Sequence, residues 1–282
     1  MGECYADLHL HTTASDGTQG IADVVDRAKT LGFSTIAITD HDTISAELTG
    51  RVTRIDGVEV ITGVEIKALF DDVPGELLGY FVDPGLPALQ ELFSFMQRSR
   101  VERMAEMVER CRRHAGIDIT AEEVSGLAAG SIGRPHLAQL LVDKGAVPSI
   151  REAFDRFIAS GKPCYVPLDK PDFRKVIQAV HDAGGITAIA HPCFMRVEDW
   201  NSFLNLAQTE GVDGIEVFYP YEPLSSGFRI CKEELTTLAK KHGFLLTGGS
   251  DDHGLASDKQ TLGKVQVLCR YVDEIKAACG LA

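Results

Sequence analysis

Residues 5–17 read YADLHLHTTASDG, a short apolar run that passes into two histidines and then a polar turn. Similar runs, each followed by an amphipathic stretch, recur along much of the chain, and this rhythm is typical of β-α units around a largely parallel sheet. We expect seven strands, and therefore a barrel, near residues 5–8, 35–39, 58–62, 77–81, 186–190, 214–218 and 244–247.

Helical patterns alternate with several of these strands. Each is followed by a glycine, the residue that most often ends a helix in the left-handed conformation. The helices are expected over residues 21–31, 175–183 and 232–242, and their stop signals are Gly32, Gly184 and Gly243.

The alternation of strands and helices stops in the middle of the chain. There a charged helical stretch over 89–114 precedes shorter helical segments over 134–144 and 149–159. We therefore predict an α/β barrel with an inserted helical subdomain that caps it and that leaves and returns on one face. The barrel takes residues 1–86 and 168–282, and the insertion takes residues 87–167.

Candidate metal ligands fall at the predicted strand ends: His9 and His11, Asp40 and His41, Glu65, His191, and Asp251 and His253. The carboxyl ends of parallel barrel strands open onto one face, so these groups can share a site. In HLH the two histidines project from the same side of an extended strand and can coordinate one ion. Imidazole and carboxylate together suit zinc, manganese or iron.

Some of these residues have simpler interpretations. Asp16, in SDG, is either a ligand or a turn-forming aspartate before glycine, and His191 before Pro192 could simply end a strand. Asp40 is expected to orient His41. Five of the nine histidines lie at predicted strand ends, however, and packing alone does not explain that.

The formal net charge is −13, with 41 acidic and 28 basic residues, so the surface as a whole should repel a polyanion. Extended nucleic-acid binding is therefore disfavoured, whereas a small anion held at metal ions is compatible with this charge. The apolar runs are far shorter than the roughly 20 residues that span a bilayer, so no membrane association is expected. Nothing in the sequence indicates an oligomeric state.

Seven cysteines are scattered along the chain without a CxxC pair. This distribution does not suggest a disulfide framework, so we expect reduced, mostly buried thiols and a cytoplasmic protein.

Five motifs follow one another along the chain: DLHLHTTASDG (7–17), AITDHDT (37–43), GVEI (63–66), AIAHP (188–192) and GGSDDHG (248–254). In this order they resemble the polymerase and histidinol phosphatase (PHP) family within the amidohydrolase superfamily. The resemblance implies a distorted seven-stranded (β/α)7 barrel and two or three divalent ions of manganese, zinc or iron. One ion would be held by His9, His11, Glu65 and Asp251, a second by Glu65 and His191, and a third by Asp16, His41 and His253.

Two positions depart from the family pattern. ELLGY (76–80) carries Glu76 where the family has a histidine that binds the second ion. Glu76 is then an oxygen ligand, or the site is binuclear, or Glu76 is a surface acid. Asp252 replaces an aromatic residue, and we expect it to be a solvated acid.

The insertion contains GRPHLAQLLVDKG (133–145) and EAFDRFIASGKPCYVP (152–167). These segments resemble the branch that includes 3′,5′-nucleotide bisphosphate phosphatases and 5′ to 3′ oligonucleotide exonucleases. By this resemblance Arg134 and His136 become catalytic phosphate binders, since arginine can clasp a phosphate bidentately and imidazole can donate to it.

We therefore expect a metal-dependent phosphoesterase that removes the 3′-phosphate of a 3′,5′-nucleotide bisphosphate by a metal-activated water. Exonucleolytic cleavage of short oligonucleotides and hydrolysis of histidinol phosphate are the alternatives within this chemistry. A non-catalytic metal-stabilised module, or a related barrel that hydrolyses amides or lactones, would be a protein of another class.

Overall fold

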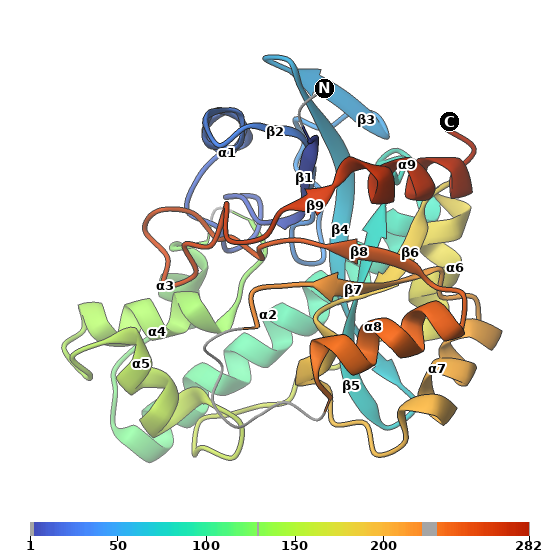
Figure 1. The fold of residues 1–282 in the computed structure, drawn as a ribbon. Coiled ribbons are helices and arrows are strands. Elements are labelled where there is room, and N and C mark those ends of the chain that lie inside the picture. The colour runs from blue at the N-terminus through green and yellow to red at the C-terminus, as the bar shows by residue number, and fades with distance from the viewer. Residues whose placement is uncertain (1–2, 129, 222–229, 282) are drawn as a thin grey trace.

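The computed structural model describes residues 3–128, 130–221 and 230–281 (Figure 1). Its strands form one sheet in the order β8-β7-β6-β5-β4-β2-β1-β9, and β3 pairs with β4 outside this path. The strands are β1 (Tyr5–Leu10), β2 (Phe33–Ile38), β3 (Val52–Ile55), β4 (Val58–Phe70), β5 (Val73–Tyr80), β6 (Ile186–Ile189), β7 (Gly214–Phe218), β8 (Leu245–Gly248) and β9 (Val267–Leu268).

The sheet curls until its two ends meet. Beyond β8, the Asp251 amide donates to the His9 carbonyl (2.8 Å), and the His11 amide donates to the Asp252 carbonyl (3.0 Å). These bonds lay the segment after β8 alongside β1 and nearly close the barrel. The predicted seven-stranded barrel is confirmed, with β3 and β9 as additional strands.

One strand runs against the predicted parallel direction. β5 is antiparallel to both β4 and β6. It follows β4 after a turn at Asp71 and Asp72, where Asp71 has a φ of 50°, and a connection this short can join only antiparallel strands. The start of β5 therefore lies beside the end of β4, which places Glu76 on the ligand face of the barrel. Glu65 lies within β4, not after it.

Helices surround the barrel: α1 (Ile21–Thr30), α6 (Phe173–Asp182), α7 (Trp200–Thr209), α8 (Lys232–Lys241) and α9 (Cys269–Ala278), with the short 3₁₀ helix η2 (Pro192–Phe194) after β6. The expected stop signals are confirmed, because Gly32, Gly184 and Gly243 have φ angles of 83°, 74° and 75°. In the part of the chain that the structure describes, no helix is long and apolar enough to cross a membrane.

The predicted insertion contains α2 (Pro87–Ala115), α3 (Ala121–Ser125), α4 (Arg134–Asp143), α5 (Ile150–Ala153) and the π-helical turn η1 (Phe154–Ile158). Figure 1 shows α3, α4 and α5 grouped on one side of the sheet, away from α6, α7 and α8. Buried residues such as Met107, Leu137 and Ile158 form a hydrophobic cluster of their own, drawn only from residues 104–164. Leu89 and Leu92, near the start of α2, belong to the barrel core instead, and the division of the chain at residues 87 and 167 stays a prediction.

The expectation that the insertion leaves and returns on one face is wrong. Because β5 is antiparallel, the chain leaves it at the far end of the barrel, where the Asp83 amide donates to the Ala183 carbonyl (2.9 Å) just before β6. It returns at the ligand face, where the Leu69 amide donates to the Pro171 carbonyl (2.9 Å). The 29-residue helix α2 spans roughly 40 Å and covers this distance.

A buried ion pair ties α2 to the ligand face. Arg100 on α2 pairs with Asp42, which lies in the loop after β2, and Arg100 Nη1 also donates to the Ile132 carbonyl (3.2 Å) just before α4. One side chain thereby fixes both the long helix and the start of α4 relative to the barrel.

The expectation that all cysteines are reduced is wrong for one pair. Cys4 and Cys269 form a disulfide across a Cα–Cα distance of 5.4 Å and a sequence separation of 265 residues. The antiparallel pairing of Tyr5 with Leu268 brings the two cysteines together. No local spacing pattern can reveal such a pair.

Candidate metal centre

Side chains from both ends of the sequence converge at the ligand face. His11 Nε2 lies 3.2 Å from Asp251 Oδ1 and 3.4 Å from Glu65 Oε2. His9 Nε2 lies 3.5 Å from Glu65 Oε2 and 3.7 Å from Asp251 Oδ1. The structure therefore brings together the residues that the resemblance assigns to the first ion.

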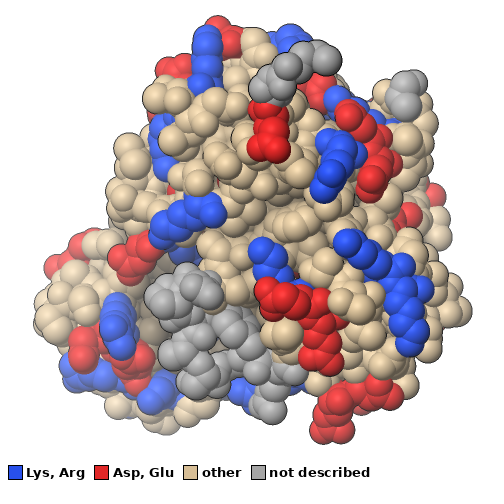
Figure 2. Space-filling model, viewed as in Figure 1, with Lys and Arg blue, Asp and Glu red and all other residues tan. Residues whose placement is uncertain are grey.

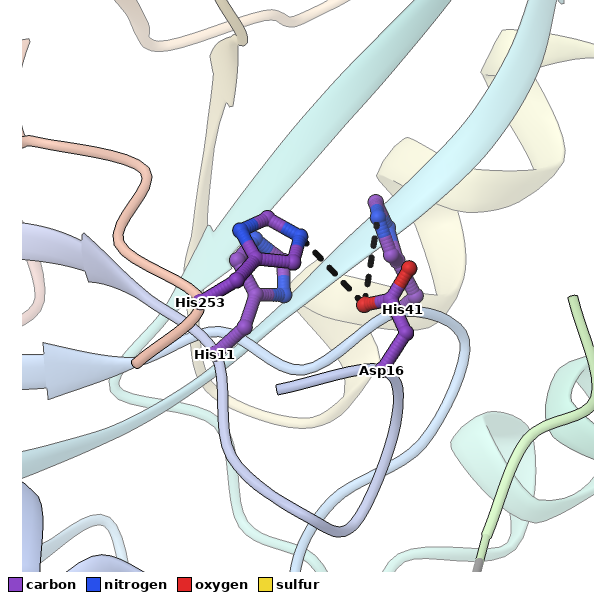
Figure 3. A group of neighbouring side chains, drawn as sticks. All are labelled: His11, Asp16, His41 and His253. Atoms are coloured by element: carbon purple, nitrogen blue, oxygen red, sulfur yellow. Dashed lines mark ion pairs between the residues drawn. The ribbon is translucent and has the colours of Figure 1, made fainter. Parts of the chain in front are cut away.

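A second set, which we call the histidine-rich group, consists of His11, Asp16, His41 and His253 (Figure 3). Their potential ligand atoms all lie within 4.8 Å of one another. Asp16 Oδ1 lies 3.4 Å from His253 Nε2 and 3.9 Å from His41 Nε2. The carboxylate of Asp16 thus faces two imidazoles, which its role in a turn would not require.

Several buried atoms of this cluster make no hydrogen bond: His9 Nε2, both ring nitrogens of His11, Asp16 Oδ1, His41 Nδ1 and Glu65 Oε2. A buried polar atom left unsatisfied costs about 1–3 kcal/mol, so six such atoms at one place need a common partner. Divalent ions coordinated by imidazole and carboxylate would satisfy such atoms. The residues present therefore fit a metal centre.

The third set, which we call the lysine corner, consists of Glu65, Glu76 and His191 together with Lys67. His191 Nε2 lies 2.9 Å from Glu65 Oε1 and 3.0 Å from Glu76 Oε2. Lys67 Nζ forms an ion pair with Glu76 Oε1. Unlike the histidine-rich group, this corner contains its own cation.

Neutral imidazole and ionised carboxylate are the forms that bind metal. Burial acts to lower the pKa of His9, but the carboxylates of Glu216, Glu65 and Asp251 raise it well above its usual range. Burial, with the nearby charges of His253 and His41, lowers the pKa of His11 to about 3. Burial acts to raise the pKa of Glu65, but His41 and His9 hold it well below its usual range. Burial lowers the pKa of Lys67, and the carboxylate of Glu65 opposes this effect.

Glu216 on β7 is a buried carboxylate that the sequence analysis missed. Its Oε1 accepts from His9 Nδ1 (2.9 Å) and its Oε2 accepts from the His191 amide (2.7 Å). Donation from Nδ1 leaves the Nε2 lone pair of His9 directed at the cluster. A glutamate inside the otherwise apolar strand GIEVF was the available signal.

Lys259 and Tyr219 were also missed, and both hold Asp251. Lys259 Nζ lies 2.6 Å from Asp251 Oδ2, and the Tyr219 hydroxyl donates to the same oxygen (2.8 Å). These contacts leave Asp251 Oδ1 to face the histidines.

Two expected roles of aspartates are wrong. Asp40 does not orient His41; its Oδ1 accepts from the Thr12 amide (2.7 Å) and the Ser15 hydroxyl (2.6 Å), so it shapes the loop that carries Asp16. Asp252 is not solvated.

The side chain of Asp252 is 1% exposed and forms an ion pair with Arg27 Nη1 (2.9 Å). It also accepts from the Thr261 and Leu262 amides (2.6 and 2.8 Å), which anchors the loop after β8.

A cavity of about 250 Å³ adjoins the lysine corner. One wall contains Glu76 and His191, and the cationic side chains around it are Lys67, Arg103, Arg134 and Lys170. The guanidinium of Arg134 lies 5.3 Å from the ring centre of Phe154 and 5.9 Å from that of Tyr165.

No carboxylate of the described residues pairs with Arg103 or Arg134. Burial and the neighbouring charge of Arg134 lower the pKa of Arg103 to about 10. Two arginines crowded together in this way are suited to an anionic ligand.

His136 lies apart from Arg134 and does not line this cavity. Its Nδ1 accepts from the Gly133 amide (3.0 Å) at the start of α4, which leaves Nε2 as the available donor. Burial lowers the pKa of His136, and the carboxylate of Asp16 opposes this effect. The structure therefore brings Arg134 to the cavity but not His136.

Known proteins share this sequence and fold. A 5′-3′ exoribonuclease, Rnm, from Escherichia coli is 31% identical over 88% of this chain and 84% of its own length. A 3′,5′-nucleoside bisphosphate phosphatase from Chromobacterium violaceum is 28% identical over 94% of each chain. A solved Bifidobacterium adolescentis protein, assigned as a metal-dependent phosphoesterase, is 31% identical with a TM-score of 0.82, over 96% of this chain and 95% of that one.

The PHP domain matches residues 7–181, a stretch that begins with the first histidine motif and runs through the insertion into α6. Because this match spans more than half of the sequence, the chain belongs to the PHP domain family of metal-dependent phosphoric ester hydrolases.

Proposed function

We propose that this chain hydrolyses a phosphomonoester of a small nucleotide, most specifically the 3′-phosphate of a 3′,5′-nucleotide bisphosphate. The observation that carries this proposal is the cavity of about 250 Å³ that lies between the candidate metal ligands and a cationic wall. A substrate with two phosphate groups would present one on the side of the cavity that faces the candidate metal centre. It would present the other to Arg103 and Arg134, which lack a carboxylate partner among the described residues.

The proposed centre holds two or three divalent ions of manganese, zinc or iron. The residues that would hold them are His9, His11, Asp16, His41, Glu65, His191, Asp251 and His253, with Glu76 at one corner. Such ions, when bound, polarise phosphoryl oxygens, activate a water molecule and offset the charge that develops on the leaving oxygen.

Arg134 would have one of two roles. It would bind and orient the phosphate group that is not hydrolysed, or it would neutralise the charge of the phosphate group that is hydrolysed. Its guanidinium is already held between Phe154 and Tyr165, so less side-chain freedom is lost on binding. His136 would donate from Nε2, since its other ring nitrogen already accepts from the Gly133 amide.

The surface charge supports a small substrate over a long polyanion. The net charge is −13, and the face shown in Figure 2 has Lys and Arg side chains dispersed among Asp and Glu side chains. A long nucleic acid needs a continuous row of phosphate contacts, which such a face does not offer.

Exonucleolytic cleavage of short 5′-phosphorylated oligonucleotides is the second candidate. The Escherichia coli relative named as a 5′-3′ exoribonuclease favours it. The cationic wall would then hold the 5′-phosphate of the oligonucleotide while the neighbouring phosphodiester is cleaved.

A product analysis separates these candidates. Manganese-loaded protein is incubated with nucleoside 3′,5′-bisphosphates, nucleoside monophosphates, short oligonucleotides and histidinol phosphate. Release of inorganic phosphate and a 5′-monophosphate, fastest from the bisphosphates, is expected. Mononucleotides released one by one from oligonucleotides would favour the second candidate, and no turnover of any substrate would refute both.

A further inference from the structure

The lysine corner differs from the rest of the centre in how its charges are satisfied. Lys67 and Glu76 are direct partners in the antiparallel register of β4 and β5. Side chains at such positions point to the same face, so the ammonium and the carboxylate meet across the two strands and form an ion pair. Because Lys67 lies two residues after Glu65 on β4, it projects from the same side as Glu65.

Both oxygens of Glu76 are engaged. Oε1 pairs with Lys67, and Oε2 lies 3.0 Å from His191 Nε2. His191 Nε2 in turn lies 2.9 Å from Glu65 Oε1. No side-chain atom of Lys67, Glu76 or His191 is among the buried atoms without a hydrogen bond, whereas His11, Asp16 and His41 each contribute such atoms.

We propose that Lys67 is a built-in cation of the metal centre, and that its ammonium takes the place of one divalent ion at Glu65, Glu76 and His191. The centre then holds two ions, one between His9, His11, Glu65 and Asp251 and one in the histidine-rich group. This inference rests on the proposed metal-dependent function.

Electrostatics gives the physical reason. An ammonium and a divalent ion at the same carboxylate repel each other, and this repulsion is strong where water is largely excluded. Lys259 pairs with Asp251 Oδ2 in the same way, but His9 Nε2 and His11 Nε2, which face Asp251 Oδ1, are left without hydrogen bonds. His191 Nε2, which faces Glu76 Oε2, is not left so. Lys67 also lines the cavity with Arg134, so its charge lies where the substrate phosphate is proposed to bind. A lysine provides this charge in every molecule, whereas a weakly held ion would be present only in some.

Metal stoichiometry tests the inference without reference to activity. Wild-type protein, Lys67→Met and Lys67→Arg are saturated with manganese, desalted, and analysed for ions per chain by plasma mass spectrometry. We expect two ions in the wild type, three in Lys67→Met and two in Lys67→Arg, which keeps the charge. Lys170→Met is the matched control, because Lys170 lines the same cavity without pairing with Glu76, and it should keep two ions.

Anomalous diffraction from Lys67→Met should locate the additional ion between Glu65, Glu76 and His191. Three ions in the wild type, or two in a folded Lys67→Met, would overturn the role of Lys67. If Lys67→Met does not fold, Lys67→Gln repeats the test with a polar side chain of lower volume. A wild-type protein that binds no ion would instead contradict the proposed function itself, so the two failures are distinguishable.

Discussion

The histidine-rich group and the lysine corner lie on the same face of the barrel, yet they are built in opposite ways. In the first, His11, Asp16 and His41 carry buried atoms without hydrogen bonds. In the second, Lys67 supplies a positive charge from within the chain, and Glu76 and His191 are paired. One region requires an external cation, and the other already has one.

This difference shows that a set of imidazoles and carboxylates does not by itself define a metal site. What matters is whether the lone pairs that converge there are left unsatisfied by the protein. Unsatisfied lone pairs in a buried position are expensive, so their persistence indicates a ligand. Lone pairs already held by an ammonium have no such need.

The largest expected effect is on the histidine-rich group. His253→Ala should lower kcat/KM on the order of 10³-fold, because it removes a ligand and the charge stabilisation that its ion provides. The ion count should fall by one while the circular dichroism spectrum stays unchanged. Full activity with an unchanged ion count would show that this group is not a metal site.

Arg134→Ala tests the cationic wall beside the lysine corner. It should remove about 2–4 kcal/mol of transition-state stabilisation, by analogy with the loss of one preorganised donor of charge-stabilising hydrogen bonds. Steady-state kinetics on a nucleoside bisphosphate measures this loss, and the ion count should stay constant. Arg98→Ala, at an exposed position on the same insertion, is the control and should behave like the wild type.

Glu216→Gln affects both regions, because Glu216 orients His9 and also accepts from the His191 amide. Loss of a carboxylate that orients a ligand typically weakens metal affinity 10–100-fold. Competition with a chromophoric chelator measures the affinity. Unchanged affinity would mean that packing alone holds His9 in place.

The smallest effect is expected in the lysine corner. Glu76→Gln removes the partner of Lys67 but no ligand of the two proposed ions, so kcat/KM should fall by less than about tenfold, in keeping with a partly exposed ion pair. The ion count should remain two. A fall in kcat/KM as large as that of His253→Ala, together with the loss of one ion, would show that Glu76 is a metal ligand. The lysine corner and the histidine-rich group would then be built in the same way.

Much of this molecule was predictable from local patterns. Apolar runs placed most of the strands, and glycines at positions 32, 184 and 243 ended helices because they tolerate positive φ angles. The alternation of side chains along β1 and the residue that follows it directed His9 and His11 inward. The order of motifs along the chain indicated which carboxylates and imidazoles would meet at one face of a barrel. Strand positions, helix ends and the alternation of side chains depend on neighbouring residues, so the sequence alone determines them. The set of residues expected to meet at one face also drew on the resemblance of the ordered motifs to a known family.

Strand direction and long-range partners were decided only by the tertiary structure. The hydrophobic pattern of β5 is the same in either direction, and only its antiparallel course sets Glu76 opposite Lys67. Glu216 reaches His9 across 207 residues, and Cys4 reaches Cys269 across 265. Burial of Asp252 depends on Arg27 in a distant helix. The hydrophobic pattern of a segment indicates which of its residues are buried. The residue that each one contacts across the sheet depends on the order and direction of the strands, and interactions between sequence neighbours do not encode that order or direction.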